Sequence, residues 1–166
     1  MEFYFENITV YSMRLMLQAR YYLAAKRMTI WLLVYILLGI WIANPDADGS
    51  VNYLSLMICI GFTCYLLLQP YFMTRKAIKR EMQFYNGTIP PVNFRFGDQI
   101  MIWSHDASRT VEYYQIAKVR CLKNVYLLCL SDKSALLLDK AGFTCGTFAD
   151  FKQFLRTKRP DLKIPE

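Results

Sequence analysis

Two long stretches without a charged residue, separated by only a short acidic segment, constrain this chain more than any other feature of its sequence. They cover residues 28–45 and 49–74. At about 1.5 Å per residue in an α-helix, the first reaches roughly 27 Å, close to the roughly 30 Å hydrocarbon thickness of a bilayer. The sequence therefore predicts a hairpin of two transmembrane helices, 28–45 and 51–73.

Aromatic and polar side chains in the two stretches fit a membrane location. Tryptophan and tyrosine lie near the ends of the predicted helices, where amphipathic rings favour the headgroup level; they are Trp31, Trp41, Tyr53 and Tyr71. Uncharged polar residues of the second helix are expected to face the partner helix; they are Asn52, Ser55, Thr63 and Gln69. The alternative is a buried helical hairpin in a soluble protein, but a chain this short has too little other helix to cover two such helices.

The charges that flank the hairpin predict its orientation. Basic residues precede the first helix and follow the second; they are Arg14, Arg20, Lys26 and Arg27, then Arg75, Lys76, Lys79 and Arg80. The connecting loop carries only Asp46 and Asp48. Positively charged flanks stay on the cytoplasmic side, so both termini are expected there, with the acidic loop outside. Two carboxylates without further oxygen ligands make a poor calcium site, and no metal or cofactor is expected.

The segments outside the hairpin are expected to be cytoplasmic, and the first of them is residues 1–27. It opens with "MEFYF", whose alternation is typical of a short strand. Thr9 is expected to cap a helix that starts directly after it. That helix either continues into the first transmembrane helix or packs on the cytoplasmic domain.

Residues 75–166 are predicted to form a domain of antiparallel strands followed by one helix. The strand-like segments, separated by turn residues, are 99–103, 109–116, 118–122, 125–131 and 135–139. In the final helix Thr147 and Asp150 approximate a capping box, and an apolar stripe follows; the stripe is Phe148, Phe151, Phe154 and Leu155. This order favours a small bent sheet or barrel with one open end plugged by the helix.

Several segments of the chain together carry a family resemblance: "ITVY", the hairpin with basic inner flanks, and "FRFGDQIMIW", "VEYYQIAKV" and "NVYLLCLSDKSALLLDKAGFTCGTFADFKQFL". With these features the chain resembles the YcxB-like membrane proteins of bacteria. The resemblance implies that residues 75–166 are a YcxB-like C-terminal domain, similar to bacterial pleckstrin-homology-like (PH-like) domains, at the plasma membrane. Asp139 stands where the family usually has proline. The family has no generally assigned activity, so no catalytic residue is implied.

No motif of catalysis is found in the sequence, and the protein is expected not to be an enzyme. The contiguous Ser104, His105, Asp106 and Ser108 are interpreted as a hairpin turn, because neighbouring side chains on an extended chain point apart. Asp132 and Asp139 are expected to serve turns. The five cysteines are interpreted as buried small hydrophobes in a reducing compartment. The sequons at Asn7 and Asn86 should carry no glycan on the cytoplasmic side.

Basic residues after the hairpin indicate contact with membrane lipids. Arg75, Lys76, Lys79 and Arg80 lie next to the second helix, and we expect them to contact anionic headgroups. A phosphoinositide site would need clustered basic residues in one strand-loop. The candidates are dispersed instead, at Arg95, Arg109, Lys118, Arg120 and Lys123. The same dispersal disfavours nucleic acid as a partner.

Three functions are consistent with these features. The first is a membrane-anchored, non-enzymatic interaction or regulatory module that binds a protein partner at the inner leaflet. The second is an immunity protein that protects the cell against a membrane-acting toxin. The third, a small oligomeric transporter or pore, is disfavoured because the helices carry no intramembrane ionisable relay. Gly39 and Gly61 are isolated rather than in G-x-x-x-G, which leaves a homo-oligomer open.

Overall fold

The computed structural model describes residues 4–43, 53–105 and 107–165. Within them the chain divides into two compact units. One, the β unit, combines Met1–Ala19 with Ile78–Glu166, and the other, the hairpin unit, is Arg20–Ala77. The loop that holds Asp46 and Asp48 lies outside the described residues, as does Asp106.

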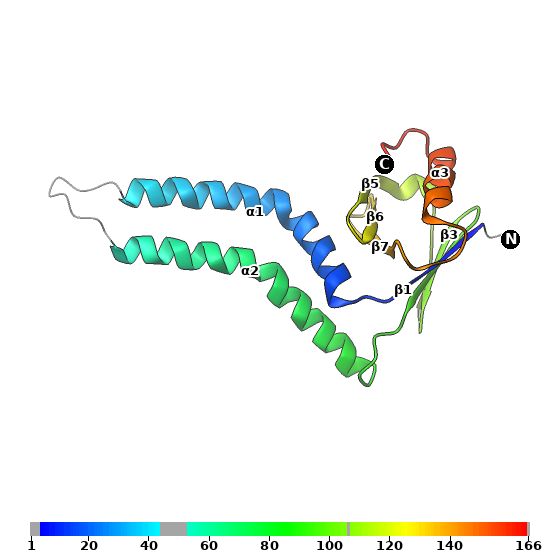
Figure 1. Ribbon diagram of the computed structural model, residues 1–166, viewed down its shortest axis with the longest axis horizontal. Helices are drawn as coiled ribbons and strands as arrows, with labels where there is room; N and C mark the ends of the chain where they lie inside the picture. The colour runs from blue at the N-terminus through cyan, green and yellow to red at the C-terminus, as the bar shows by residue number, and fades with distance from the viewer. Residues whose placement is uncertain (1–3, 44–52, 106, 166) are drawn as a thin grey trace. The chain divides into compact units, whose positions relative to one another are not determined.

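The hairpin unit contains the greater part of two long helices (Figure 1). Helix α1 is Met13–Ala43 and helix α2 is Tyr53–Phe84. Both are long and apolar enough to cross a membrane, over Met13–Trp41 and Leu56–Phe84. The prediction of two such helices is confirmed, and α1 runs without a break from the N-terminal segment into the first charge-free stretch.

The predicted start of the N-terminal helix is wrong by several residues. Thr9 is the last residue of a strand, and α1 begins at Met13. Ser12 occupies the capping position, because its Oγ accepts a hydrogen bond from the Leu15 backbone N–H at 3.4 Å. The Thr9 hydroxyl is engaged elsewhere, in a buried network described below.

Contacts between α1 and α2 are made by a few aromatic and polar groups. The rings of Tyr35 and Phe62 lie 4.6 Å apart, and the Tyr21 hydroxyl donates to the Leu67 carbonyl oxygen at 3.0 Å. The sides that face away from these contacts stay open: Leu37 is 67% exposed and Trp41 75%. The hairpin unit therefore turns large apolar side chains outward.

Pro70 stands inside α2 and alters the helix locally. Proline has no N–H, so the carbonyl of Leu66 loses its partner within the helix, and the ring favours a kink. One turn later the hydroxyl of Thr74, which is fully buried, donates to the Pro70 carbonyl oxygen at 2.7 Å. The turn around Pro70 is thus held by a side chain as well as by the helix itself.

The β unit contains two antiparallel sheets. The five-stranded sheet has the order β4-β3-β2-β1-β8 and the three-stranded sheet the order β5-β6-β7. Their strands are β1 Phe5–Thr9, β2 Val92–Phe96, β3 Ile100–Ser104, β4 Ala107–Val111, β5 Ile116–Cys121, β6 Val125–Leu130, β7 Ala135–Asp139 and β8 Phe143–Cys145. The predicted antiparallel region is confirmed, but neither sheet is closed into a barrel.

Two predicted strands differ from the observed ones. The first strand begins at Phe5 and runs to Thr9, so it lies later than "MEFYF". The segment 109–116 is broken, because a short 3-10 helix, η1 (Tyr113–Gln115), separates β4 from β5. The Glu112 backbone N–H donates to Gln115 Oε1 at 3.2 Å, which closes this turn locally. The break is what allows the chain to pass from one sheet to the other.

Helix α3 (Phe148–Lys158) seals the core between the two sheets. Its Phe151 is fully buried, with its ring centroid 4.5 Å from that of Phe96 on β2. As predicted, Thr147 caps the helix: its hydroxyl oxygen accepts from the Asp150 N–H at 3.2 Å. The final helix and its apolar stripe are therefore confirmed.

A buried polar network links the two sheets where β1 meets β7. Asn7 Nδ2 donates to the Asp139 carbonyl oxygen at 2.8 Å, and the Thr9 hydroxyl donates to Asn7 Oδ1 at 2.7 Å. The Asp139 N–H in turn donates to Thr9 Oγ1 at 2.9 Å. The chain is so close here that a Cβ on Gly142 would lie 2.2 Å from the Ile8 carbonyl oxygen. Within this network the side-chain atoms Asn7 Nδ2, Asn7 Oδ1 and Thr9 Oγ1 each have a partner, as burial demands.

Candidate functional site

An open cleft between the two helices lies at the basic end of the hairpin unit. It has a volume of about 420 Å³. Its walls are Arg20, Leu23, Ala24 and Arg27 of α1 and Gln69, Pro70 and Met73 of α2. The cleft thus combines two guanidinium groups and an amide with an apolar lining.

Helical spacing explains why these α1 residues share one wall. Positions three, four and seven apart fall on the same side of a helix, which places Ala24 between Arg20 and Arg27. The two arginine backbones are about 10 Å apart along the helix axis. Ala24 has only a methyl group, so the space between the two long side chains stays open. The Tyr21 hydroxyl donates a hydrogen bond to the Leu67 carbonyl oxygen, which helps to hold α2 on the opposite side of the cleft.

The electrostatics of this cleft are one-sided. The described residues of the hairpin unit, 20–43 and 53–77, contain no aspartate or glutamate. They contain Arg20, Lys26, Arg27, Arg75 and Lys76. Within the described chain, neither Arg20 nor Arg27 forms an ion pair. The arrangement is suited to an anion that arrives from outside the chain.

A second cleft of about 370 Å³ lies farther along the same two helices and has a different character. It is lined almost entirely by apolar groups; its walls are Tyr35, Ile36, Gly39, Ile40, Leu56, Cys59, Ile60, Thr63 and Cys64. The hydroxyl of Thr63 is already used, because it donates to the Cys59 carbonyl oxygen at 2.9 Å. This second cleft offers an apolar surface and no charged group.

The four residues predicted to contact lipid headgroups all lie on α2 and are all exposed; they are Arg75, Lys76, Lys79 and Arg80. At about 100° per residue they span roughly 140° of the helix surface, which makes one basic stripe. None of them lines the cleft. The sequence identified Arg20 and Arg27 only as flanking charges and expected Gln69 to face the partner helix. The structure brings these three together.

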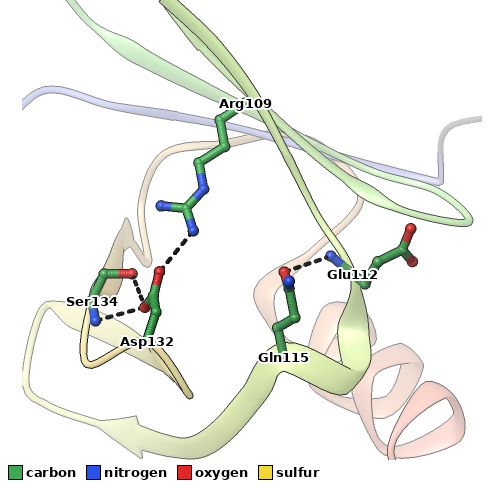
Figure 2. A network of polar contacts seen from close by, with 5 residues as sticks. All are labelled: Arg109, Glu112, Gln115, Asp132 and Ser134. Carbon is green, nitrogen blue, oxygen red and sulfur yellow. Dashed lines mark hydrogen bonds and ion pairs between the residues drawn. The ribbon is translucent and has the colours of Figure 1, made fainter.

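In the β unit, a polar network joins the middle of β4 to the turn between β6 and β7 (Figure 2). Arg109 Nη2 donates to Asp132 Oδ2 at 2.8 Å, and the Ser134 N–H and hydroxyl donate to Asp132 Oδ1 at 2.8 and 2.5 Å. The hydrogen bonds from Ser134, and then that from Arg109, lower the pKa of Asp132 to about 2. Asp132 is therefore a fixed carboxylate at neutral pH. It serves the turn, as predicted.

A pair of shallow clefts in the β unit borders the C-terminal end of α2. The larger, of about 330 Å³, is lined by Phe84, Tyr85, Asn86, Thr88, Pro90 and His105, and the smaller, of about 210 Å³, shares Tyr85 and Pro90 with it. Phe84 is 77% exposed. Tyr11 lines the smaller cleft, and burial, followed by the charge of Glu81, raises the pKa of its hydroxyl to about 12. An exposed aromatic ring beside hollows of this size suits contact with another molecule.

The remaining sequence candidates have structural positions. Ser104 pairs with Ala107, so the predicted hairpin turn falls between β3 and β4, while Ser108 lies in β4 opposite Trp103 and Asp106 lies outside the described residues. Asn7, the first sequon, is fully buried, which closes it to glycosylation. Among the described residues no group of three or more His, Cys, Asp or Glu side chains could hold a metal ion.

The interpretation of the cysteines as buried hydrophobes is wrong. Cys64 and Cys145 are exposed, and the other three are half-buried. Cys64 lies on the exposed surface of the apolar helix α2, and Cys145 ends the three-residue edge strand β8. All five are free thiols.

No protein-family model, curated protein or solved structure matches the chain. The function must be inferred from the architecture and from the chemistry of the sites described above.

Proposed function

We propose that this protein is a non-enzymatic, membrane-anchored interaction module of the bacterial plasma membrane. The hairpin unit crosses the bilayer twice and holds the β unit at the inner leaflet, where it binds a protein partner. The observation that carries this proposal is the outward exposure of large apolar side chains along two helices of membrane-spanning length. In water this surface would be an aggregation hazard, whereas in lipid it is the favoured one.

The pairing of β1 with β2 supports an even number of crossings. Strand β1 precedes the hairpin and β2 follows it, yet the two are hydrogen-bonded from Phe5 opposite Phe96 to Thr9 opposite Val92. Paired strands must lie on the same side of a membrane. If α1 crosses the bilayer, α2 must cross it back.

The charge distribution supports the inner leaflet as that side. Each helix carries its basic residues at the end nearer to the β unit in sequence, and the undescribed loop at the other end holds the two acids. Lys and Arg next to transmembrane helices are retained in the cytoplasm. We therefore propose that the N- and C-termini are both cytoplasmic.

The β unit supports binding better than catalysis as its role. Its most polar cluster, Arg109 with Asp132 and Ser134, is satisfied within itself and joins two sheets. Its open feature is the pair of clefts beside exposed Phe84. We propose this surface as the contact for a protein partner, and a YcxB-like, PH-like fold as the family assignment.

Cysteine labelling in intact cells tests the topology. In a background without the five native cysteines, Ser50→Cys should react with a membrane-impermeant maleimide added from outside, while Gln153→Cys on α3 should react only after permeabilisation. Labelling of Gln153→Cys in intact cells, or recovery of the protein in the soluble fraction, would overturn the membrane proposal.

Photo-crosslinking tests the protein partner. A photoreactive phenylalanine analogue in place of Phe84 should give a discrete protein adduct in cells. The same analogue in place of Gln153 is the control and should give none. Adducts to lipid alone at position 84 would show that the exposed ring is a membrane contact, and the partner part of the proposal would fall.

A further inference from the structure

We propose that the cleft between α1 and α2 binds the headgroup of an anionic phospholipid, with Arg20 and Arg27 as the phosphate ligands and Gln69 as a neutral donor. This inference rests on the proposed membrane anchoring and adds to it a site of defined chemistry. Both guanidinium groups and the amide line one hollow of about 420 Å³. That space admits a headgroup between the helices rather than on their surface.

The choice of side chains favours phosphate. A guanidinium group presents a planar set of donors that binds phosphate oxygens in pairs, and it is more weakly hydrated than an ammonium group. Lys26 is the neighbour of Arg27 in sequence but does not line the cleft. Only the arginines of this segment face the hollow, on either side of the small Ala24.

The described hairpin unit supplies no negative charge to balance Arg20 and Arg27. Two guanidinium groups in one hollow repel each other unless an anion lies between them. In the described hairpin unit no carboxylate is available to do so, and α2 contributes only Gln69 as a polar side chain to the opposite wall. A bound phosphate would supply the negative charge that the described residues of the hairpin unit lack.

The position along the hairpin favours a lipid over a free anion. The cleft lies at the border between charged and charge-free sequence, since Arg27 is followed by the stretch 28–45 and Met73 lies two residues before Arg75. This border is where headgroups meet acyl chains, and basic pockets between transmembrane helices on the cytoplasmic side suit acidic headgroups. Leu23 and Met73 give the lining apolar surface that a glycerol backbone and the first acyl carbons would contact.

The cleft and the basic stripe on α2 predict different behaviour. An exposed stripe such as Arg75 with Lys76 attracts any negatively charged surface and is screened by salt. A cleft lined by two guanidinium groups should hold one anionic lipid molecule and should prefer it over a zwitterionic lipid of the same chain length. A test that separates the two sets of residues therefore tests the site itself.

Native mass spectrometry of the full-length protein in detergent provides this test. Phosphatidylglycerol and phosphatidylcholine of equal chain length are titrated against the wild type, Arg20→Gln/Arg27→Gln, and the control Arg75→Gln/Lys76→Gln. Loss of two charge-assisted contacts should weaken phosphatidylglycerol binding about tenfold or more. We expect that loss in the cleft variant and less than about threefold in the control.

A second variant tests the guanidinium geometry, and a soluble competitor distinguishes a lipid site from a free-phosphate site. Arg20→Lys/Arg27→Lys retains the charge but not the paired donors, and it should also weaken binding if the guanidinium geometry matters. Equal affinity for both lipids, or equal loss in the cleft and stripe variants, would overturn the site. Displacement of the lipid by glycerol 3-phosphate at equal concentration would show a free-phosphate site instead. If the lipid site fails while Ser50→Cys still labels from outside, the membrane anchoring stands without it.

Discussion

The two units of this protein treat apolar side chains in opposite ways. In the β unit the largest rings and aliphatic groups are inside, with Phe96 and Phe151 fully buried. In the hairpin unit they are outside, with Trp41 and Leu54 at least 70% exposed. Both acidic and basic residues occur throughout the β unit, whereas the described residues of the hairpin unit include no acidic residue. The difference supports the proposal that the two units meet different solvents, water around the β unit and lipid around the hairpin.

The largest expected effect comes from matched phenylalanines in the two units. Phe151→Ala removes a ring from the closed core and should cost the β unit about 3–5 kcal/mol of unfolding free energy. Phe72→Ala, at an exposed position of α2, should change the unfolding free energy of the β unit by less than about 0.5 kcal/mol. Urea denaturation in detergent, followed by Trp103 fluorescence in a Trp31→Phe/Trp41→Phe background, measures both. Equal destabilisation would contradict the division into two units.

A negative charge placed on the exposed surface of each unit should have a large effect in the hairpin unit and a small one in the β unit. On the proposed topology Leu37→Asp should cost about 2.5–3.5 kcal/mol of membrane insertion, because Leu37 is 67% exposed and lies near the middle of the charge-free stretch 28–45. Tyr114→Asp, at a residue of the β unit that is 74% exposed, should be nearly neutral. Alkaline-carbonate extraction of membranes gives the inserted fraction. A Leu37→Asp protein that inserts like the wild type would show that the outer surface of α1 does not meet lipid.

The buried polar network predicts a smaller loss within the β unit. Asn7→Ala removes one hydrogen bond to the Asp139 carbonyl oxygen and the acceptor of the Thr9 hydroxyl proton, which should cost about 1–3 kcal/mol. Gln153→Ala, at an exposed position of α3, is the control and should change the same measurement little. An unchanged urea midpoint for Asn7→Ala would mean that the link between the sheets contributes nothing.

The smallest effect concerns pH. The pKa of Asp132 is about 2 in the folded protein, below its ordinary value of about 4. Its carboxylate therefore contributes stability above about pH 4, and that contribution is lost as the pH falls through about 2. In the Asp132→Asn variant the urea midpoint should change less with pH in this window, and the hairpin unit should be unaffected. A wild-type pH profile in the variant would place the acid sensitivity elsewhere, for example at Asp161, whose pKa is also lowered by its hydrogen bond from Arg159.

Features set by local sequence were predictable. The two apolar helices follow from uninterrupted runs without charge, and the cap of α3 follows from Thr147 three residues before Asp150. The N-terminal cap was not predictable in the same way. Thr9 and Ser12 are both good capping residues, and the choice depends on a tertiary contact, since the Thr9 oxygen accepts from the N–H of Asp139 in β7. That bond also requires a residue other than proline at position 139, because proline has no N–H to donate.

The strand pairing and the cleft lay beyond sequence reasoning because both depend on partners far apart in the chain. Nothing near Phe5 indicates that it pairs with Phe96, or that β1 lies between β2 and β8. The arginines at positions 20 and 27 were visible as flanking charges. Their meeting with Gln69 depends on how α1 and α2 are aligned, which Tyr21 and Leu67 help to set.

Strand β1 is separated from its partner β2 by the whole hairpin, and this has a consequence for biogenesis. The ribosome delivers β1 first, roughly 80 residues before β2, at about 5–20 residues per second. On the proposed topology, the strand stays an unpaired edge for several seconds while both helices enter the translocation machinery. Its other neighbour, β8, emerges later still. A chain interrupted before position 145 would leave that edge open to foreign strands, so cells should be intolerant of C-terminal truncations that spare both helices.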